Sequence, residues 1–349
     1  MAQAFNRLGG IFPKGSGKGI AGGVGAHRPE GGGRFAIWLI RSIGRYGGRG
    51  VARALLPFIT VYFLLRRSAE RRDSQAYLSR VLGRRASWWD VARHIHCFAS
   101  TILDRVFLLG GQLERFDVAI GGLDDLHAAL DQRRGVLLLG SHLGSFEVLR
   151  VLARQRPDYV IRVVLDKGHN PAMTQLLDEL NPDIAAGVID AGQDGPALML
   201  QIQQAVQSGA LVALLADRVH RMENSVDAPF LGQPARFPLT PWLVAAALKV
   251  PVVLGFGLYR GGNRYDLVFE PFSDGLDIPR QRRRTELAAL IRRYAERLEH
   301  HARSAPFNWF NFYDFWDHPD AHATETPVAS VVAGDRRGHA RVRGVGDHA

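Results

Sequence analysis

Cysteine is almost absent from this 349-residue chain, which has a single one, Cys97. That count excludes an internal disulfide framework and a cysteine-based zinc site, and it fits a reducing compartment. We interpret Cys97 as a small buried hydrophobe. We expect neither a metal nor a cofactor. The N-terminal apolar stretches, residues 35–40 and 54–65, are also too short to match the ~20 apolar residues of a spanning helix.

Acidic residues are scarce in the first third of the chain. The net charge is +10; residues 35–116 carry 14 Lys and Arg against 5 Asp and Glu, whereas residues 117–349 carry 25 against 28. Such an excess favours an anionic partner: phospholipid headgroups, nucleic acid or an acidic protein. Composition alone does not choose among them.

The two ends lack apolar periodicity. Residues 1–33 are basic and rich in glycine, and residues 319–349 combine Gly, His and Arg, so we predict disordered tails. Residues 34–134 are expected to be helical. In the first part of this helical region, arginines at 41, 45, 49 and 53 recur every four residues between the apolar stretches 35–40 and 54–65. This spacing favours an amphipathic element lying on a membrane. The alternative is a helix pair packed on the rest of the chain with arginines on its solvated face.

From residue 135 to 318 the pattern alternates between short β-branched or aliphatic runs and helical segments. This alternation predicts an α/β domain with a mainly parallel mixed sheet flanked by helices. The expected strands are 136–139, 159–165, 187–189, 211–216, 250–259 and 265–269, and the expected helices are 146–155, 171–180, 197–207, 241–249 and 281–301.

His142 and Glu147 stand where the first of these strands ends, in the stretch 135–150. In one continuous helix, residues five apart lie about 140° apart around the axis, but a turn between them removes that separation. Ser145 is a candidate N-cap, which would place Glu147 in the first helical turn. Glu147 would then accept a hydrogen bond from His142. Ligands bind at the carboxyl ends of strands in such sheets, which is where His142 falls.

A His–carboxylate pair without metal ligands suits general-base activation of a substrate hydroxyl. Backbone N–H groups of Gly144 and Ser145 would stabilise the developing oxyanion. Other interpretations stay open: a histidine that is merely hydrogen-bonded, a serine hydrolase that uses Ser141 or Ser145, or a membrane-binding protein without catalysis. A nucleic-acid-binding protein is disfavoured, because no recognised module is present.

The residues of this stretch resemble a known family. The run Ser141 to Glu147 is similar to the His-x-x-x-x-Asp/Glu signature of the lysophospholipid acyltransferase superfamily, in the branch of the late lipid A acyltransferases. Residues 211–218, 226–240 and 247–253 are similar to later blocks of that branch. The resemblance covers about residues 35–317 and implies a glycerolipid acyltransferase-like fold.

The resemblance implies that His142 is the catalytic base and Glu147 its partner. The donor would be an acyl thioester on acyl carrier protein or coenzyme A, and the acceptor a hydroxyl of a lipid or glycolipid. Attachment to the cytoplasmic face of the bacterial inner membrane is also implied, peripheral or shallowly anchored. The substrate-binding residues would be Leu143, Gly144, Ser145, Phe146, Lys167, Asn170, Asp217, Arg218, Phe230, Gly232 and Arg236.

Two segments depart from the lipid A enzymes. Lys167 stands near the place of an arginine that helps to position substrate, and lysine does not make the two-pronged contact of a guanidinium with phosphate. Residues 306–316 hold seven aromatic residues in eleven positions. That ending is more similar to predicted acyltransferases of fatty-acid or aryl-polyene type clusters. It is either a closing segment over the core or a wall for an acyl chain.

Overall fold

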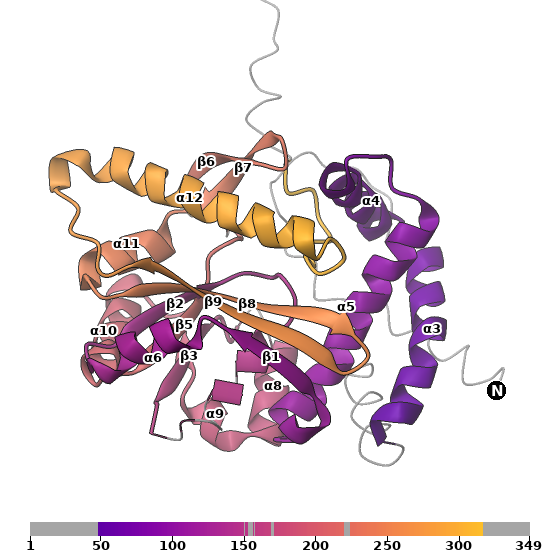
Figure 1. Cartoon of the computed structure of the whole chain (residues 1–349), viewed down its shortest axis with the longest axis horizontal. Helices are drawn as coiled ribbons and strands as arrows, with labels where there is room; N and C mark the ends of the chain where they lie inside the picture. The colour runs from indigo at the N-terminus through magenta and orange to yellow at the C-terminus, as the bar shows by residue number, and fades with distance from the viewer. Residues whose placement is uncertain are drawn as a thin grey trace, which may run out of the picture. The chain divides into compact units, whose positions relative to one another are not determined.

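A computed structural model of the chain describes residues 48–149, 151–152, 156, 158–168, 171–219 and 224–316. The expected tails, the first apolar stretch and Asn170 lie outside these residues. One sheet organises the described chain (Figure 1). Its seven strands are β1 (Asp117–Gly121), β2 (Val136–Gly140), β3 (Ile161–Leu165), β4 (Ile189–Asp190), β5 (Leu211–Leu215), β8 (Val252–Gly261) and β9 (Arg264–Ser273).

The strand order is β1-β9-β8-β2-β5-β3-β4. Every neighbouring pair is parallel except the β8–β9 hairpin. The predicted fold class is therefore confirmed: a mixed, mostly parallel sheet flanked by helices. β2 lies between β8 and β5. Beyond β2 on the β5 side, helices connect the parallel strands: α8 (Pro171–Leu180) and α9 (Pro182–Ala186) lead from β3 to β4, and α10 (Gly195–Gln207) leads from β4 to β5.

Both faces of the sheet are covered, as the central strand β2 shows: it is buried at every position. In β2, Leu137 and Leu139 belong to one hydrophobic cluster, while Val136 and Leu138 belong to another on the opposite face. In Figure 1, α12 crosses one face of the sheet and α6 lies on the other.

The helices are α3 (Gly48–Arg66), α4 (Ser68–Leu82), α5 (Trp88–Leu109), α6 (Leu123–Asp131), α8 (Pro171–Leu180), α9 (Pro182–Ala186), α10 (Gly195–Gln207), α11 (Thr240–Leu248) and α12 (Arg283–Ser304), with 3₁₀ turns η1 (Leu113–Arg115), η2 (Phe146–Leu149) and η3 (Arg280–Arg282).

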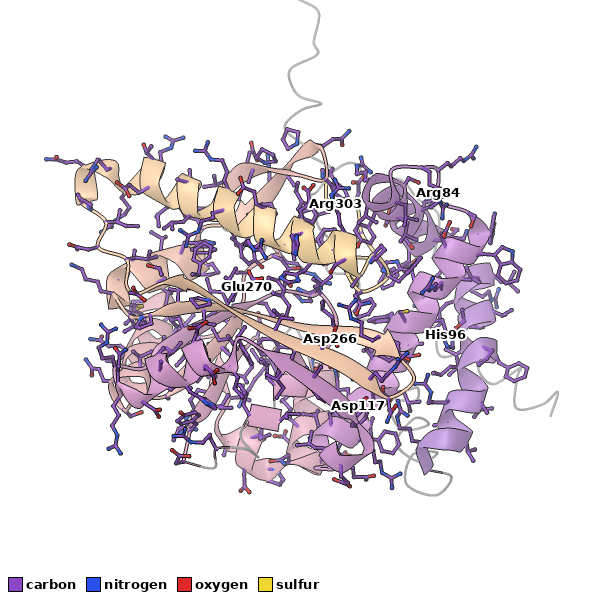
Figure 2. The ribbon with its side chains drawn as sticks, viewed as in Figure 1. Arg84, His96, Asp117, Asp266, Glu270 and Arg303 are labelled. Atoms are coloured by element: carbon purple, nitrogen blue, oxygen red, sulfur yellow. The ribbon has the colours of Figure 1, made fainter. Side chains whose placement is uncertain are left out.

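Helix α12 is fixed to the sheet through Glu270 of β9 (Figure 2). Its carboxylate oxygens accept hydrogen bonds from Arg297 at 2.7 Å each, and Oε1 also lies 2.7 Å from Nε2 of His301. Burial opposes ionisation of Glu270, but these contacts outweigh it and lower the pKa to about 2. On the same helix, Tyr294 donates a hydrogen bond to the carbonyl of Gly140 at 2.9 Å, so α12 reaches the end of β2.

The structure differs from the sequence expectation in three strands. β1 belongs to the seven-stranded sheet although it lies within the region predicted to be helical. β6 (Ser225–Phe230) and β7 (Gln233–Pro238) form a separate antiparallel hairpin that was not predicted. Prolines at 229, 234 and 238 weaken the strand pattern in this hairpin, because proline lacks the N–H that a ladder needs.

Helix α3 is a single helix that packs on α5, and two of its arginines face inward. Arg49 donates hydrogen bonds to both oxygens of buried Asp104, at 2.8 and 2.9 Å, and Arg53 donates to the hydroxyl of Tyr259 at 3.0 Å. The alternative interpretation, in which a packed helix pair keeps its arginines on a solvated face, is therefore wrong for these two arginines. Arg41 and Arg45 lie outside the described residues.

Candidate active site

The register of two parallel strands brings His142 and Asp217 together. In the β2–β5 pairing, Gly140 is opposite Leu215, and each strand ends at that residue. His142 and Asp217 each stand two positions beyond their strand end, so they occupy matching places at the carboxyl edge of the sheet. The N–H of Ala216 also donates to the carbonyl of Gly140 at 3.0 Å, which extends the pairing towards the site.

Asp217 holds both the backbone and the ring of His142. Oδ1 of Asp217 lies 2.8 Å from Nδ1 of the imidazole, and Oδ2 accepts the backbone N–H of His142 at 3.0 Å. Asp217 is completely buried, whereas the side chain of His142 is 29% exposed. Burial alone would raise the pKa of Asp217, but the charges and hydrogen bonds of His142, together with Arg218, keep the pKa below its usual value.

This geometry determines which ring nitrogen of His142 can act as a base. An ionised carboxylate only accepts hydrogen bonds, so Nδ1 must carry the proton that points at Asp217. In the neutral ring, Nε2 then carries the lone pair. His142 is therefore oriented as a general base at Nε2.

Glu147 has other partners than the one expected. It is in the first turn of η2, as predicted, and it is buried. Its Oε1 lies 2.6 Å from Nε of Arg105 on α5, and its Oε2 accepts a hydrogen bond from the hydroxyl of Ser145 at 2.9 Å. The carboxylate on Nδ1 of His142 is that of Asp217, so the expected geometry of the pair is corrected. Ser145 donates through its side chain instead of accepting as an N-cap.

The expected oxyanion donors are already engaged in backbone hydrogen bonds. The N–H of Gly144 donates to the carbonyl of Asn308 at 2.8 Å, and the N–H of Ser145 donates to that of Gly257 at 2.8 Å. Gly144 has φ +79°, and a Cβ there would lie 1.9 Å from the carbonyl oxygen of Gly257. The turn therefore packs directly on β8, and these two N–H groups do not point at a substrate.

The aromatic ending forms one side of the site. Residues 308–310 run beside residues 142–144: Leu143 and Trp309 form an antiparallel bridge, and the N–H of Phe310 donates to the carbonyl of His142 at 3.0 Å. Asn308 is buried and its side chain bonds both backbone groups of Tyr259 in β8. This segment is thus a strand-like closure over the turn that carries His142.

Arg218, expected to bind substrate, holds the same segment. Its Nε donates to the side chain of Asn311 at 2.6 Å and its Nη2 to the carbonyl of Phe310 at 2.9 Å. Phe146 and Leu143 also lie beside the site: the ring of Phe146 lies against Gly140, and Leu143 is buried under Trp309. These contacts describe packing around His142.

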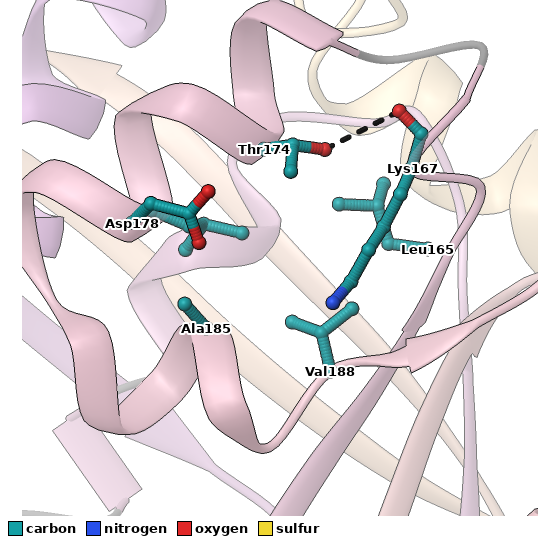
Figure 3. A pocket seen from close by; sticks show the side chains of 7 residues that line it. Leu165, Lys167, Thr174, Asp178, Ala185 and Val188 are labelled. Atoms are coloured by element: carbon teal, nitrogen blue, oxygen red, sulfur yellow. Dashed lines mark hydrogen bonds between the residues drawn. The ribbon is translucent and has the colours of Figure 1, made fainter.

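The remaining predicted binding residues fall in two other places. Lys167 follows β3 and lines a narrow pocket between β3, α8 and α9, where Thr174 donates to its carbonyl (Figure 3). Phe230, Gly232 and Arg236 belong to the β6–β7 hairpin. Phe230 is fully buried, with its ring 5.0 Å from that of Trp309 between centroids. Only Phe230 of these residues connects to the site, through packing with Trp309.

Comparison with known proteins gives one match and one negative result. A family model described as bacterial lipid A biosynthesis acyltransferase matches residues 99–318, which is more than half of the chain. The chain belongs to this family. No curated protein matches it. The protein is therefore an acyltransferase, and its family acts on lipid with an acyl donor and a lipid acceptor. The resemblance to the lipid A acyltransferase branch is confirmed.

The geometry of this acyltransferase does not favour a serine nucleophile. Ser145 is buried and its hydroxyl donates to Glu147, while Ser141 is buried at the end of β2. Within the described ranges, no three His, Cys, Asp or Glu side chains cluster closely enough to hold a metal ion. His142 and its carboxylate Asp217 form an acid–base pair at this site.

Two residues of the acyltransferase site were not singled out from the sequence. Arg105 pairs with Glu147 from the middle of α5, and Trp309 donates its indole N–H to Asp217 at 3.0 Å. The sequence feature that could have pointed to Trp309 was its place in the aromatic stretch, residues 306–316. No local pattern marked Arg105, because its partner lies 42 residues further along the chain.

Proposed function

We propose that this acyltransferase moves a fatty-acyl or polyene-acyl group from an acyl thioester to a hydroxyl of a lipid or glycolipid. The observation that supports this best is the orientation of His142, whose Nδ1–H points at Asp217 and whose Nε2 carries the lone pair. A part-exposed imidazole held in one tautomer suits removal of a proton from a hydroxyl.

The reaction follows from that orientation. The hydroxyl proton of the acceptor moves to Nε2 while its oxygen bonds to the thioester carbonyl carbon. The resulting imidazolium is stabilised by Asp217. Collapse of the tetrahedral intermediate breaks the carbon–sulfur bond, and the leaving thiolate takes the proton from Nε2. The products are the acylated lipid and a free thiol, and His142 returns to its starting tautomer.

The donor is proposed to be acyl carrier protein, with acyl-CoA as the alternative. Acyl carrier proteins are acidic, and the basic excess of residues 35–116 suits such a partner. Purified protein should be given each thioester together with bacterial membrane lipids, and thiol release and acylated lipid should be measured. Thiol release without an acylated lipid would point to hydrolysis and would overturn the proposal.

Glu147 is proposed to act by positioning the turn of His142. Replacing Glu147 with glutamine leaves the part-buried Arg105 without its counter-charge, so we expect a loss of about 1–3 kcal/mol in unfolding free energy and a lower kcat. Arg105→Met should lower kcat to a similar degree, measured with thermal or urea unfolding as the stability control. If Glu147 instead touched the reacting atoms, Glu147→Gln would lose far more activity than Arg105→Met.

The acyltransferase is proposed to lie on the cytoplasmic face of the inner membrane, with α3 as the contacting helix. Among the described residues, α3 alone is long and apolar enough to cross a membrane, judged by length and composition. Its inner face packs on α5 and carries the Arg49–Asp104 pair. We infer that it lies in the interface, because a helix bound to protein along one face cannot be surrounded by lipid.

The outward face of α3 carries an apolar stripe. Phe58 is 73% and Leu65 is 72% exposed, and the spacing of three or four along the stripe places its members on one helix face: Val51, Leu55, Phe58, Val61 and Leu65. A stripe of this kind inserts its side chains among acyl chains.

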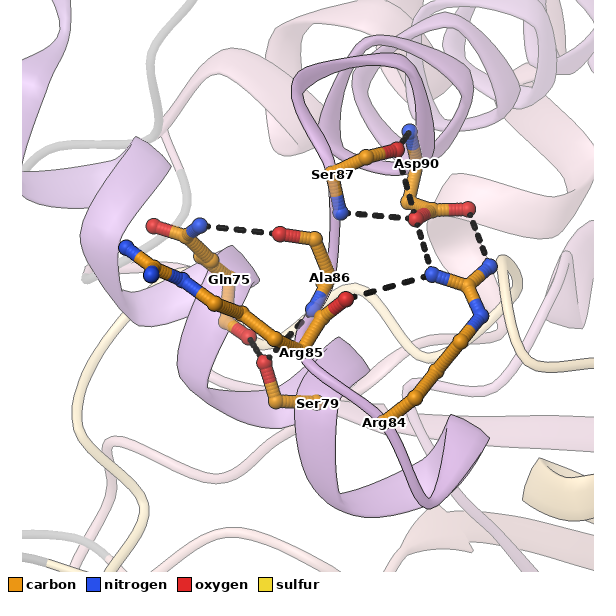
Figure 4. Close-up of polar contacts among 7 residues, drawn as sticks. All are labelled: Gln75, Ser79, Arg84, Arg85, Ala86, Ser87 and Asp90. Atoms are coloured by element: carbon orange, nitrogen blue, oxygen red, sulfur yellow. Dashed lines mark hydrogen bonds and ion pairs between the residues drawn. The ribbon is translucent and has the colours of Figure 1, made fainter.

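Two tryptophans extend the apolar surface at the end of α5 that lies beside the end of α3. Trp89 is 84% exposed, and Arg71 stacks on the ring of Trp88 while it donates to the carbonyl of Leu64 in α3. The preceding loop is fixed by the Ser87–Asp90 capping box and by two hydrogen bonds from Arg84 to Asp90 (Figure 4). Tryptophans held in this way suit the headgroup region of a bilayer.

Vesicle binding tests this membrane surface. Phe58→Ser and Trp89→Ser should each weaken binding to vesicles of phosphatidylethanolamine and phosphatidylglycerol by about 10-fold or more, because each removes a large apolar side chain from the contact. Leu200→Ser, at a residue of α10 that is 54% exposed, is the matched control and should not weaken binding in a flotation assay. Equal weakening by all three variants would contradict the proposed surface.

A further inference from the structure

Trp309 connects the catalytic carboxylate to the core of the protein. It is completely buried, and its indole N–H donates to Oδ2 of Asp217 at 3.0 Å. Oδ2 also accepts the backbone N–H of His142, while Oδ1 faces the imidazole. Among the described residues, Asp217 therefore receives three N–H donors: two from His142 and one from the indole of Trp309.

The backbone of Trp309 is held as firmly as its ring. Its carbonyl lies 2.9 Å from Nε2 of His94, and Nδ1 of His94 lies 2.8 Å from the hydroxyl of Ser74. A carbonyl only accepts, so Nε2 of His94 must carry the proton and Nδ1 must accept from Ser74. Burial lowers the pKa of His94 to about 4, despite the opposing hydrogen bond to Trp309, so this ring is neutral near pH 7.

Aromatic packing fixes the plane of the indole. Its ring centroid lies 5.0 Å from that of Tyr77, 5.0 Å from that of Phe230 and 4.7 Å from that of Phe315. These partners come from α4, the β6–β7 hairpin and the aromatic ending. An indole held by all three cannot turn its N–H away from Asp217 without displacing the core.

We propose that Trp309 is a positioning residue of catalysis: its indole N–H holds the Asp217 carboxylate so that Oδ1 faces Nδ1 of His142 and sets the base strength of Nε2. The inference rests on the proposed role of His142 as the general base. It assigns the aromatic ending a chemical role beyond closing the core.

The direction of the effect follows from charge. A hydrogen bond from the indole draws negative charge towards Oδ2, which leaves less on the oxygen that faces the imidazole. Without that donor, Asp217 stabilises the imidazolium more strongly, and Nε2 keeps its proton to a higher pH. Less of the enzyme is then in the basic form at a given pH.

Among the described residues, Arg218 lies beside the pair and holds the aromatic ending, and Glu147 is paired with Arg105. Burial raises the pKa of Tyr294 on α12 well above its usual value, and burial likewise raises the pKa of Tyr313 in the aromatic ending. His94 titrates near 4. The acid limb of the activity profile is assigned to His142, because His142 is the general base of the proposed function.

Trp309→Phe tests the proposal, because phenylalanine keeps an aromatic ring but has no N–H. We expect the acid limb of the kcat/KM profile for acyl transfer to move to higher pH by about 0.5–1 unit, with a plateau about 3- to 10-fold lower. The matched control is Trp242→Phe. Trp242 is equally buried, belongs to the same hydrophobic cluster, and its indole nitrogen has no hydrogen-bond partner among the described residues. That variant should lose stability while its pH profile stays unchanged.

A measurement on the unmutated chain covers the case in which Trp309→Phe does not fold. With ¹⁵N-labelled tryptophan, the indole signal of Trp309 should follow the titration of His142, and in His142→Ala it should lose that transition. The signal of Trp242 should follow neither. A Trp309 signal that stays constant across the titration, or an unmoved acid limb in Trp309→Phe, would overturn the proposal. If His142→Ala keeps full turnover, it is the proposed function that fails.

Discussion

Replacing His142 with alanine should lower kcat/KM for acyl transfer by about 10²- to 10⁴-fold, the range that general-base catalysis contributes. The reason is the orientation of the ring, since Nδ1–H points at Asp217 and Nε2 is left to take the acceptor's proton. The measurement is thiol release from an acyl thioester with a lipid acceptor, followed by detection of the acylated lipid.

The matched control for this substitution is His300→Ala, because His300 is an exposed histidine on α12. It should leave turnover unchanged. His142→Ala should still unfold in one cooperative transition, with about 1–3 kcal/mol less stability, because the buried carboxylate of Asp217 loses its contact with the ring and keeps the one with the backbone N–H. Full turnover in purified His142→Ala protein would remove the basis of the proposed mechanism.

The sequence was sufficient for the fold class and for most strands of the sheet, since both depend on local patterns. Apolar runs of five residues predict buried strands, and β2, β3 and β5 lie within one to two residues of their predicted ends. The missed strand β1 is a short edge strand whose side chains alternate between partly buried and exposed, so it carries little apolar signal. Its pairing with β9 depends on residues about 150 positions away, which a local pattern does not contain.

The partner of His142 was predicted wrongly for a related reason. Glu147 was expected because it is five residues away, whereas Asp217 is 75 residues away in sequence and adjacent in the sheet. Both residues follow strands that were predicted, and in the structure each stands two positions beyond its strand end. The sequence does not state that β2 and β5 are neighbours, and two other strands, β3 and β4, come between them in the chain. Strand order is therefore the missing information.

The oxyanion prediction failed because backbone partners are not visible in a motif. Gly144 lies in the predicted turn and has a positive φ, but its close approach to Gly257 and to residues 308–310 becomes apparent only in three dimensions. The same holds for Trp309, which meets Asp217 across 92 positions of sequence. Long-range contacts thus determine how the predicted histidine is oriented.

Replacing Asp217 with asparagine should lower kcat by about 10³- to 10⁴-fold, comparable to loss of the carboxylate in a Ser-His-Asp triad. An amide presents one acceptor and one donor where the carboxylate presents two acceptors. If its oxygen faces Nδ1, its NH₂ meets the N–H groups of His142 and Trp309 in a site closed to water. If its NH₂ faces Nδ1, that nitrogen must accept, so the ring proton moves to Nε2 and the base is lost.

The pH dependence of Asp217→Asn should differ from that of a simple change in base strength. If the substitution only made Nε2 of His142 easier to protonate, raising the pH would restore the base. Raising the pH does not move the ring proton from Nε2 back to Nδ1, so the loss of kcat should persist from about pH 6 to 9. Asp266→Asn is the matched control, because Asp266 of β9 pairs with Arg260 on the surface and should be dispensable (Figure 2). Turnover close to normal in Asp217→Asn, together with a large loss in Glu147→Gln, would instead assign the orienting role to Glu147.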